Sequence, residues 1–381
     1  MPTVGDIARR YGTAYAREFS GRGMPRDHYR ILRLLQMCGT GDLGFSVQEC
    51  RSCGNTERRP LACSNRHCPG CGQAKGTEWE QAQVTRLLNV PYFMITFTLP
   101  ASLRMFVRSH PHECYPALFQ AAADALKKLA RDPRFVGATT LGFTIVLHTW
   151  GRQGNFHPHL HVMIPAGGLN ADGTRWLPSR SDFFVPVKAL SRIYRAKFRD
   201  AMMKAGLLPL IRPSVWEENF VTDSQAVGDG RTSFRYLACY VSRTAISNSR
   251  IVSMDDGNVR FRWKKSGSRR WRTMTVTAIE FLRRFLQHVL PSGMQRIKHY
   301  GFLSSGTKHS IDHIRELVVV SNAELVDRPT EEQTLRTDDR NGISLPSDLK
   351  PTGPPCSNCG QPTSFLDRIP PERLLGLFDP G

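Results

Sequence analysis

Acidic residues are scarce in this sequence of 381 residues, which has 33 Asp and Glu against 52 Lys and Arg and a formal net charge of +19. No stretch approaches the roughly 20 apolar residues that a membrane span needs, and the first residues lack the apolar core of a secretory signal. We therefore expect a cytoplasmic protein that is neither secreted nor embedded in a membrane. A hydrophobic fraction of 40% excludes wholesale disorder. The positive charge favours a polyanionic partner, either nucleic acid or an anionic membrane surface.

Cysteine is crowded into one short segment. Six of the ten cysteines lie within residues 38–71, namely Cys38, Cys50, Cys53, Cys63, Cys68 and Cys71. Without a secretory signal, such crowding favours metal binding over a disulfide framework. The competing interpretation is a set of buried free thiols.

Two Cys-x2-Cys pairs predict a structural zinc site. Cys50 and Cys53 are separated from Cys68 and Cys71 by 14 residues, and four thiolates of this kind suit tetrahedral Zn²⁺. Such a closed site supports structure rather than chemistry. Two further residues of the same loop could replace a ligand or contribute to a second site, and these are Cys63 and His67.

A late Cys-x2-Cys pair, Cys356 and Cys359, is only half of a metal site. Two thiolates alone do not hold zinc. The other half would have to come from elsewhere in the chain or from a partner.

Histidines alternate along a predicted strand. His157, His159 and His161 recur with a period of two, so their imidazoles lie on one face of the strand and Pro158 and Leu160 on the other. A Gly-rich turn joins this strand to a preceding one, on which His148 lies off the apolar face. Three or four neutral imidazoles on one sheet face can bind a divalent metal. A single strand histidine would more often be structural, which does not explain four within a short hairpin.

Two tyrosines lie one helical turn apart. Tyr236 and Tyr240 occupy positions i and i+4 of a predicted helix, 233–246. Such a pair alone is more often packing, but beside a metal site a phenol can attack a phosphodiester and conserve its energy as phosphotyrosine. Arg235 and Arg243 could hold the phosphate or lower the phenol pKa, or could simply be solvated.

The segment 250–300 is strongly basic, with 12 Lys and Arg against three acidic residues. Aromatic residues, including Trp263 and Trp271, are interleaved with the cations, as in proteins that hold single strands by stacking and charge. The competing interpretation is a solvated basic face over core aromatics. The candidate DNA-binding cations are Arg260, Arg262, Lys264, Lys265, Arg269 and Arg270.

The hydrophobic pattern mixes helices and strands. Helices are expected at 4–36, 113–130, 187–203 and 233–246, a strand at 93–100 and a hairpin over 143–164. A second hairpin has its tip at 255–258, and Thr277 with Glu280 predicts a capped helix. The polar stretch 327–355 is typical of a disordered linker.

Taken together, these residues resemble the two-tyrosine HUH transposases of the bacterial insertion-sequence family ninety-one, the rolling-circle transposases and their common-region relatives. The resemblance extends from about residue 25 to 303. Its elements are Cys63-Ser-Asn-Arg-His-Cys-Pro-Gly-Cys71, Phe97-Thr-Leu-Pro100, Val146-Leu-His-Thr-Trp-Gly151, His157-Pro-His-Leu-His161, Tyr236-Leu-Ala-Cys-Tyr240, Ala245-Ile-Ser-Asn248 and His288-Val-Leu-Pro-x-Gly293.

The resemblance implies an α+β HUH endonuclease fold, an antiparallel sheet flanked by helices. Its domains would be a helical, zinc-binding N-terminal domain over 1–82, a nuclease domain over 83–303 and a C-terminal extension, largely linker, over 304–381. It implies that His159 and His161 bind Mg²⁺ or Mn²⁺, and the hairpin geometry favours His148 as third ligand with His157 as the alternative. Tyr236 and Tyr240 match the nucleophiles.

The implied reaction is nicking and joining of single-stranded DNA at transposon ends and target, through a 5′-phosphotyrosine and a free 3′-OH. Because no ATPase or helicase motif is visible, host machinery would supply unwinding. The expected location is the nucleoid of a bacterial cytoplasm, with no membrane partner; the oligomeric state stays open. The alternatives are a rolling-circle replication initiator, a conjugative relaxase, or a non-catalytic zinc-dependent DNA-binding protein.

Overall fold

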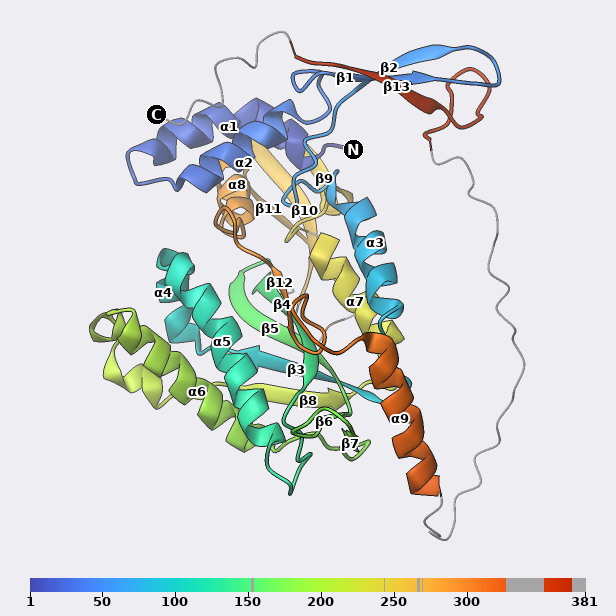
Figure 1. Ribbon diagram of the computed structural model, residues 1–381. Coiled ribbons are helices and arrows are strands. Elements are labelled where there is room, and N and C mark those ends of the chain that lie inside the picture. Colours follow the sequence, from blue (N-terminus) through green and yellow to red (C-terminus); the bar gives the residue numbers. More distant parts are fainter. Residues whose placement is uncertain (152–153, 243, 266–267, 269, 327–352, 372–381) are drawn as a thin grey trace.

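The architecture of the computed structural model is a five-stranded antiparallel sheet with helices on both faces, next to a largely helical N-terminal part (Figure 1). The predicted α+β class, an antiparallel sheet flanked by helices, is confirmed. The residues that the structure describes are 1–151, 154–242, 244–265, 268, 270–326 and 353–371.

The central sheet has the strand order β12-β4-β5-β3-β8. Every neighbouring pair is antiparallel. The strands are β3 (Tyr92–Thr98), β4 (Gly142–Trp150), β5 (Phe156–Pro165), β8 (Thr222–Ala226) and β12 (Ile297–Gly301). The predicted strand at 93–100 is therefore β3, and the predicted hairpin over 143–164 is β4 with β5.

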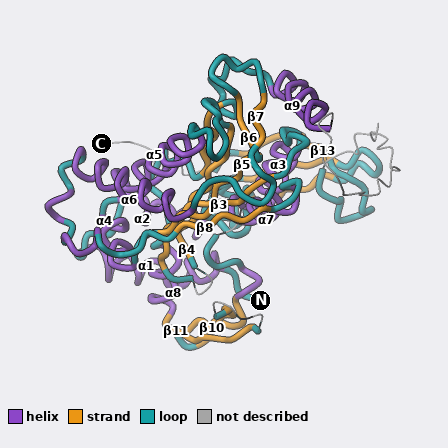
Figure 2. The backbone as a smooth tube through the Cα atoms, turned by 90° about the horizontal axis from the view of Figure 1, so that it is seen from below, coloured by secondary structure: helices purple, strands orange, loops and turns teal. Residues whose placement is uncertain are grey.

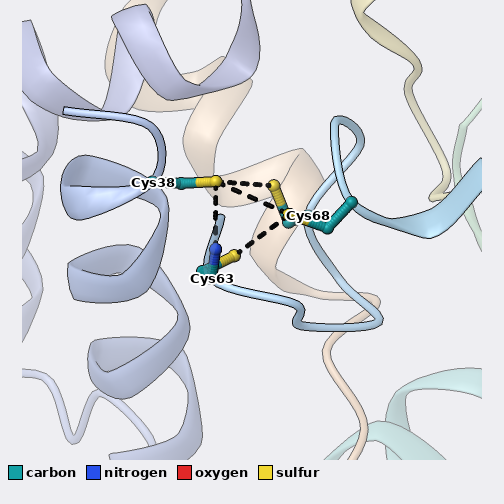
Figure 3. Close-up of side chains that lie close together, drawn as sticks. Cys38, Cys63 and Cys68 are labelled. Atoms are coloured by element: carbon teal, nitrogen blue, oxygen red, sulfur yellow. Dashed lines mark hydrogen bonds between the residues drawn. The ribbon is translucent and has the colours of Figure 1, made fainter. Parts of the chain in front are cut away.

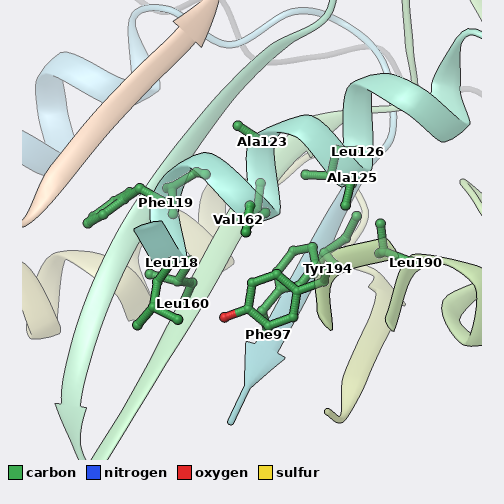
Figure 4. Packing of buried hydrophobic residues seen from close by; sticks show 14 of the residues in the cluster. Phe97, Leu118, Phe119, Ala123, Ala125, Leu126, Leu160, Val162, Leu190 and Tyr194 are labelled. Atoms are coloured by element: carbon green, nitrogen blue, oxygen red, sulfur yellow. The ribbon is translucent and has the colours of Figure 1, made fainter. Parts of the chain in front are cut away.

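One face of this sheet carries the main hydrophobic core. The strands β4 and β5 contribute Leu147, Leu160 and Val162 to this face, and these side chains are almost completely buried. The helices on this face are α4 (Arg104–Ser109), α5 (Pro111–Ala130) and α6 (Val187–Lys204). Figure 4 shows α5 contributing Leu118 and α6 contributing Tyr194 to this packing. Burying each large apolar side chain stabilises the fold by about 1.5 to 3 kcal/mol, so this face anchors the hairpin.

The opposite face is covered by α3 (Gly72–Val84) and α7 (Arg231–Ser242), which pack against each other in both views (Figures 1 and 2). Phe234 and Leu237 of α7 contact Val146 and Met163 of the sheet in one buried cluster. Because strand side chains alternate between faces, the face under α7 is also the face of the histidines.

A second large core lies around the N-terminal helices. It is formed by α1 (Val4–Ser20), α2 (Arg26–Met37), α8 (Ala278–Leu286) and the sheet of β9 (Ile251–Asp255), β10 (Asn258–Lys264) and β11 (Trp271–Thr277). The Thr3 side chain caps α1 in a reciprocal capping box with Asp6. Apolar faces of the later segment 251–286 pack against α1 and α2, so this core combines residues from both sides of the predicted boundary near residue 82.

The remaining elements include two small sheets and the last helix. They are β1 (Phe45–Glu49), β2 (Thr56–Pro60), β6 (Gly167–Leu169), β7 (Trp176–Pro178), α9 (Ile311–Val326), β13 (Ser364–Ile369) and the 3-10 turns at Ala101–Leu103, Leu208–Leu210, Pro213–Trp216 and Asn248–Arg250.

The C-terminal extension contains more regular structure than the sequence indicated. The α9 helix buries Ile314 and Val318 against Trp176, and β13 pairs with β1. Most of the predicted linker lies at 327–352, outside the described residues. None of the helices in the described part of the chain combines the length and apolar character of a membrane span.

Candidate metal centre, tyrosine site and cysteine groups

Three histidines converge on the α7-covered face of the hairpin. The β4–β5 register pairs His148 with His159 and Val146 with His161. One ligand atom from each of His148, His159 and His161 lies within 4.8 Å of the other two. His157 belongs to the same face, but its ring lies further along the strand, 5.1 Å from the ring of His159, and does not join this group. The geometry therefore favours His148 over His157 as the third ligand.

Hydrogen bonds orient the imidazoles. Nδ1 of His159 lies 2.7 Å from the carbonyl oxygen of His157, so it donates a proton there and leaves Nε2 as the lone-pair atom. Nδ1 of His161 lies 3.1 Å from Oγ1 of Thr96 on β3. Nδ1 of His148 is 3.2 Å from Nε2 of His159. Two nitrogens bound to one ion at typical metal–nitrogen distances lie about 3.0 to 3.4 Å apart, so the spacing fits a shared ion.

The surroundings keep these rings neutral. Burial lowers the pKa of His148 well below its usual range, lowers that of His159, and lowers that of His161 to about 3. Burial also lowers the pKa of His157 to about 4. Neutral imidazoles offer the lone pairs that a metal requires, so the cluster can bind a cation at neutral pH without first losing protons.

Tyr236 extends from α7 toward the histidines. Its ring centre lies 6.4 Å from that of His161, edge to face, and 43% of its surface is exposed. A phenol in this position is within reach of a phosphate bound at the imidazoles. Tyr240 lies one turn further along α7, but its side chain is outside the described part of the chain, as is residue Arg243.

Two arginines, Arg235 and Arg104, differ in their contacts. Arg235 of α7 pairs with Glu80 of α3 at 3.0 Å, which ties the two helices together. Arg104 lies at the start of α4, and no motif or spacing in the sequence marks it. Its positive charge contributes to the lowered pKa of both His157 and His159, and its buried Nε has no hydrogen-bond partner within the described residues.

Four cysteines gather beside α2. Cys38, Cys63, Cys68 and Cys71 place their sulfur atoms within 4.8 Å of one another, and Figure 3 shows three of them. The sulfur–sulfur distances are 3.6 Å for Cys38–Cys71 and Cys63–Cys71 and 3.7 Å for Cys38–Cys68. Four sulfurs around one zinc ion lie about 3.8 Å apart, whereas a disulfide bond is about 2.0 Å long.

The structure corrects the grouping that we predicted from the spacing. Cys50 and Cys53 do not join Cys68 and Cys71; they lie instead with Cys356 and Cys359 in a second group of four. Cys50 and Cys53 lie in the turn between β1 and β2, and β2 separates them in the sequence from Cys68 and Cys71. The pairing of β13 with β1 brings Cys356 and Cys359 to that turn instead. His67 belongs to neither group: it is buried, and its Nε2 accepts a hydrogen bond from the backbone of Leu290 at 3.4 Å.

The predicted DNA-binding cations lie mainly on one small sheet. Arg260, Arg262 and Lys264 alternate along the exposed face of β10, with Val259 and Phe261 buried on the other. The indole of Trp271 on β11, 45% exposed, has three cations over it: Arg250 at 5.4 Å, Arg262 at 5.7 Å and Lys264 at 4.6 Å. Lys265 and Arg270 are exposed near the end of the hairpin, and Arg269 is outside the described residues.

Comparisons with known proteins bear on this arrangement. Residues 7–99 match a family described as "Transposase zinc-binding domain", and residues 142–310 match one described as "Putative transposase". The chain is 37% identical over 335 residues to "Putative transposase y4qJ" of Sinorhizobium fredii, which covers 80% of this chain and 81% of the relative.

The chain belongs to the insertion-sequence family ninety-one of transposases. It is also 28% identical over 295 residues to "Transposase for insertion sequence element IS801" of Pseudomonas savastanoi pv. phaseolicola, covering 70% of this chain and 68% of that one. No solved structure matches it. The family membership confirms the resemblance drawn from the motifs and makes the protein a DNA-processing enzyme with a zinc-binding domain.

Proposed function

We propose that this transposase cuts and rejoins single-stranded DNA at transposon ends, and at the target, by attack of a tyrosine on a phosphate held at the three-histidine cluster. The observation that carries the proposal is the approach of the Tyr236 ring to His161, at 6.4 Å, on a face where three imidazoles converge. A nucleophile and a metal-binding cluster side by side are the two parts that this reaction needs.

The cluster fits a divalent ion held by His148, His159 and His161. Its ligand atoms converge, burial keeps the rings neutral, and the anchored Nδ1 of His159 directs Nε2 inward. Imidazole nitrogens suit first-row divalent metals, whereas Mg²⁺ prefers oxygen, so we favour Mn²⁺ of the two predicted ions. When bound, the ion supplies positive charge that polarises a phosphate oxygen.

The chemistry at the tyrosine conserves the energy of the DNA backbone. The phenol of Tyr236 gives up its proton, its oxygen forms a new bond to phosphorus, and the bond from phosphorus to the 3′ oxygen breaks. The departing oxygen takes up a proton to become a free 3′-OH, and the 5′ end stays on the enzyme as phosphotyrosine. In our proposal Tyr240, one turn away on α7, performs the second transfer that joins strands.

Arg104 is the residue that we assign to the bound phosphate. Its guanidinium is close enough to His157 and His159 to affect their pKa values, and its buried Nε has no partner in the described part of the chain. A buried donor without a partner is costly, and a phosphate oxygen would satisfy it. The charge-assisted bond would also orient the phosphodiester for attack.

The basic face of β10 and β11 is a second contact for the same strand of DNA. Its cations, Arg260, Arg262 and Lys264, can follow the phosphates while Trp271 stacks on a base. Because contacts to phosphates and stacking on a base do not involve the base edges that carry sequence information, we expect little sequence discrimination there. The host would supply unwinding, since the sequence contains no ATPase motif.

The first cysteine group is the zinc site that we assign to the N-terminal domain. Cys38, Cys63, Cys68 and Cys71 all lie within the range that matches a transposase zinc-binding domain, and the spacing of their sulfur atoms suits tetrahedral Zn²⁺. In this position the ion links the end of α2 to the loop that precedes α3, and its role is structural.

A covalent-adduct assay tests the proposed reaction. The purified protein is mixed with labelled single-stranded oligonucleotides from the flanks of its own gene, with Mn²⁺ or with EDTA. We expect a denaturant-resistant, EDTA-sensitive adduct that is lost in the Tyr236→Phe/Tyr240→Phe double variant. Tyr29→Phe is the matched control, because Tyr29 is another exposed phenol but lies on α2.

The assay also separates the alternatives. Tight binding without any adduct would contradict the proposal and leave a zinc-dependent DNA-binding protein. Cleavage directed to an origin or transfer sequence, rather than to the flanks of the gene, would favour a replication initiator or a relaxase.

A further inference from the structure

An early and a late segment of the chain meet at a second group of four cysteines. Cys50 and Cys53 belong to the β1–β2 hairpin, and Cys356 and Cys359 precede β13, which pairs with β1 as the third strand of the same sheet (Figure 1). The sulfur–sulfur distances are 3.4 Å for Cys50–Cys359 and 3.7 Å for Cys53–Cys356. These distances are too long for disulfides and close to the about 3.8 Å between thiolates on one zinc ion.

The two Cys-x2-Cys segments have the same backbone turn. The N–H of Gly54 donates to the carbonyl of Cys50 at 2.8 Å, and the N–H of Gly360 donates to that of Cys356 at 2.9 Å. Both glycines have positive φ, 69° and 71°, a conformation that favours glycine. Each turn closes with a bond from its first cysteine's N–H to the carbonyl five residues on, in Asn55 and Gln361. Two matching knuckles facing each other are a typical frame for zinc.

Each knuckle also donates a side-chain hydrogen bond to the other's sulfur. The amide Nδ2 of Asn55 lies 3.6 Å from Sγ of Cys356, and Nδ2 of Asn358 lies 3.7 Å from Sγ of Cys53. Amide donors toward sulfur stabilise the thiolate form and orient ligands around a metal. This reciprocal pattern does not depend on the sulfur spacing, and it points to the same ligand.

We propose that Cys50, Cys53, Cys356 and Cys359 bind a second structural Zn²⁺ that holds residues 353–371 on the β1–β2 hairpin. Cys356 and Cys359 lie outside both ranges that match known families, 7–99 and 142–310. In this proposal residues 356–359 complete a second zinc site of the N-terminal module, so the late half-site of the sequence finds its other half within the same molecule.

Metal content of the full-length protein tests this inference. Zinc per chain is measured by mass spectrometry of the metal on the His159→Asn/His161→Asn background, so that the imidazole cluster holds none. We expect two zinc ions per chain, falling to one in Cys356→Ser/Cys359→Ser. Cys114→Ala is the matched control, because Cys114 is buried in the main core away from both groups, and it should retain two.

A second variant and a second measurement distinguish the loss of one zinc ion from misfolding of the variant. Asn358→Ala keeps all four sulfurs, so it should still bind two zinc ions but lose one to a chelator faster than the parent. In hydrogen exchange, zinc loss from Cys356→Ser/Cys359→Ser should expose strand 364–369 while the central sheet stays protected. Two zinc ions in the Cys356→Ser/Cys359→Ser protein, one ion in the parent, or a mapped Cys50–Cys359 disulfide would each overturn the inference.

Discussion

Substitutions at two neighbouring residues of β5 should affect different properties, one the stability of the fold and the other the proposed reaction. Leu160 is fully buried in the core on one face, and His161 lies on the opposite face, in the three-histidine cluster, with 7% of its surface exposed. Leu160→Ala should lower the free energy of unfolding by about 2 to 5 kcal/mol, as is usual for a buried leucine. His161→Asn removes no core packing, and loss of its bond to Thr96 costs about 1 kcal/mol.

The two variants should behave in opposite ways in the adduct assay. At a temperature where both are folded, Leu160→Ala should form the Mn²⁺-dependent adduct at close to the parental level, because all three imidazoles remain. His161→Asn should form none at any Mn²⁺ concentration. His157→Asn is the control on the same face: its ring is outside the cluster, so the adduct should persist. Unfolding in urea, followed by fluorescence, gives the stabilities.

The reasoning fails if the pattern is reversed. A folded Leu160→Ala protein without adduct, beside a His161→Asn protein that still forms one, would mean that the alternation along β5 does not position the reacting groups.

Other consequences follow from individual residues. Arg104→Gln should slow adduct formation at least tenfold with DNA affinity little changed, whereas Arg134→Gln, at an exposed ion pair, should have no effect in the same time course. Trp271→Ala should weaken single-strand binding by roughly 5- to 150-fold, since stacking on an aromatic is worth about 1 to 3 kcal/mol per base; fluorescence anisotropy measures this. Burial lowers the pKa of His288 to about 4 from an unfolded value of 6.5. As the pH falls, the unfolded chain therefore takes up a proton before the folded protein does, which favours unfolding. The contribution of neutral His288 to the free energy of unfolding is fully present above about pH 6.5 and should fall by up to roughly 3 kcal/mol as the pH drops toward 4. His288→Gln should show a shallower loss in acid unfolding curves.

The histidine hairpin could be predicted because local alternation determines it. His157-Pro-His-Leu-His161 fixes which side chains share a face, and Phe143, Ile145 and Leu147 fix the matching face of the preceding strand. The pattern therefore indicated that His148 belongs with the imidazoles, as the register now has it. Arg104 carried no such signal, because its approach to the cluster depends on how α4 packs and not on spacing.

The pairing of the cysteine knuckles could not be predicted for a similar reason. Each Cys-x2-Cys turn is locally complete, and nothing in its spacing says which other knuckle it faces. The antiparallel pairing of β1 with β13, more than 300 residues apart, brings Cys50 to Cys359. The packing of α8 on α1 likewise depends on the complementarity of two apolar faces. Periodicity in the sequence indicates each apolar face, but it does not indicate which two faces pack together.

The most direct test of the proposed chemistry is to identify the residue that carries the DNA. The adduct formed with Mn²⁺ is digested with nuclease and protease, and the nucleotide-bearing peptide is sequenced by mass spectrometry. We predict a phosphodiester-linked nucleotide on Tyr236 or Tyr240 of α7, joined through its 5′ phosphate. A nucleotide on any other residue, or one joined through its 3′ phosphate, would contradict the account.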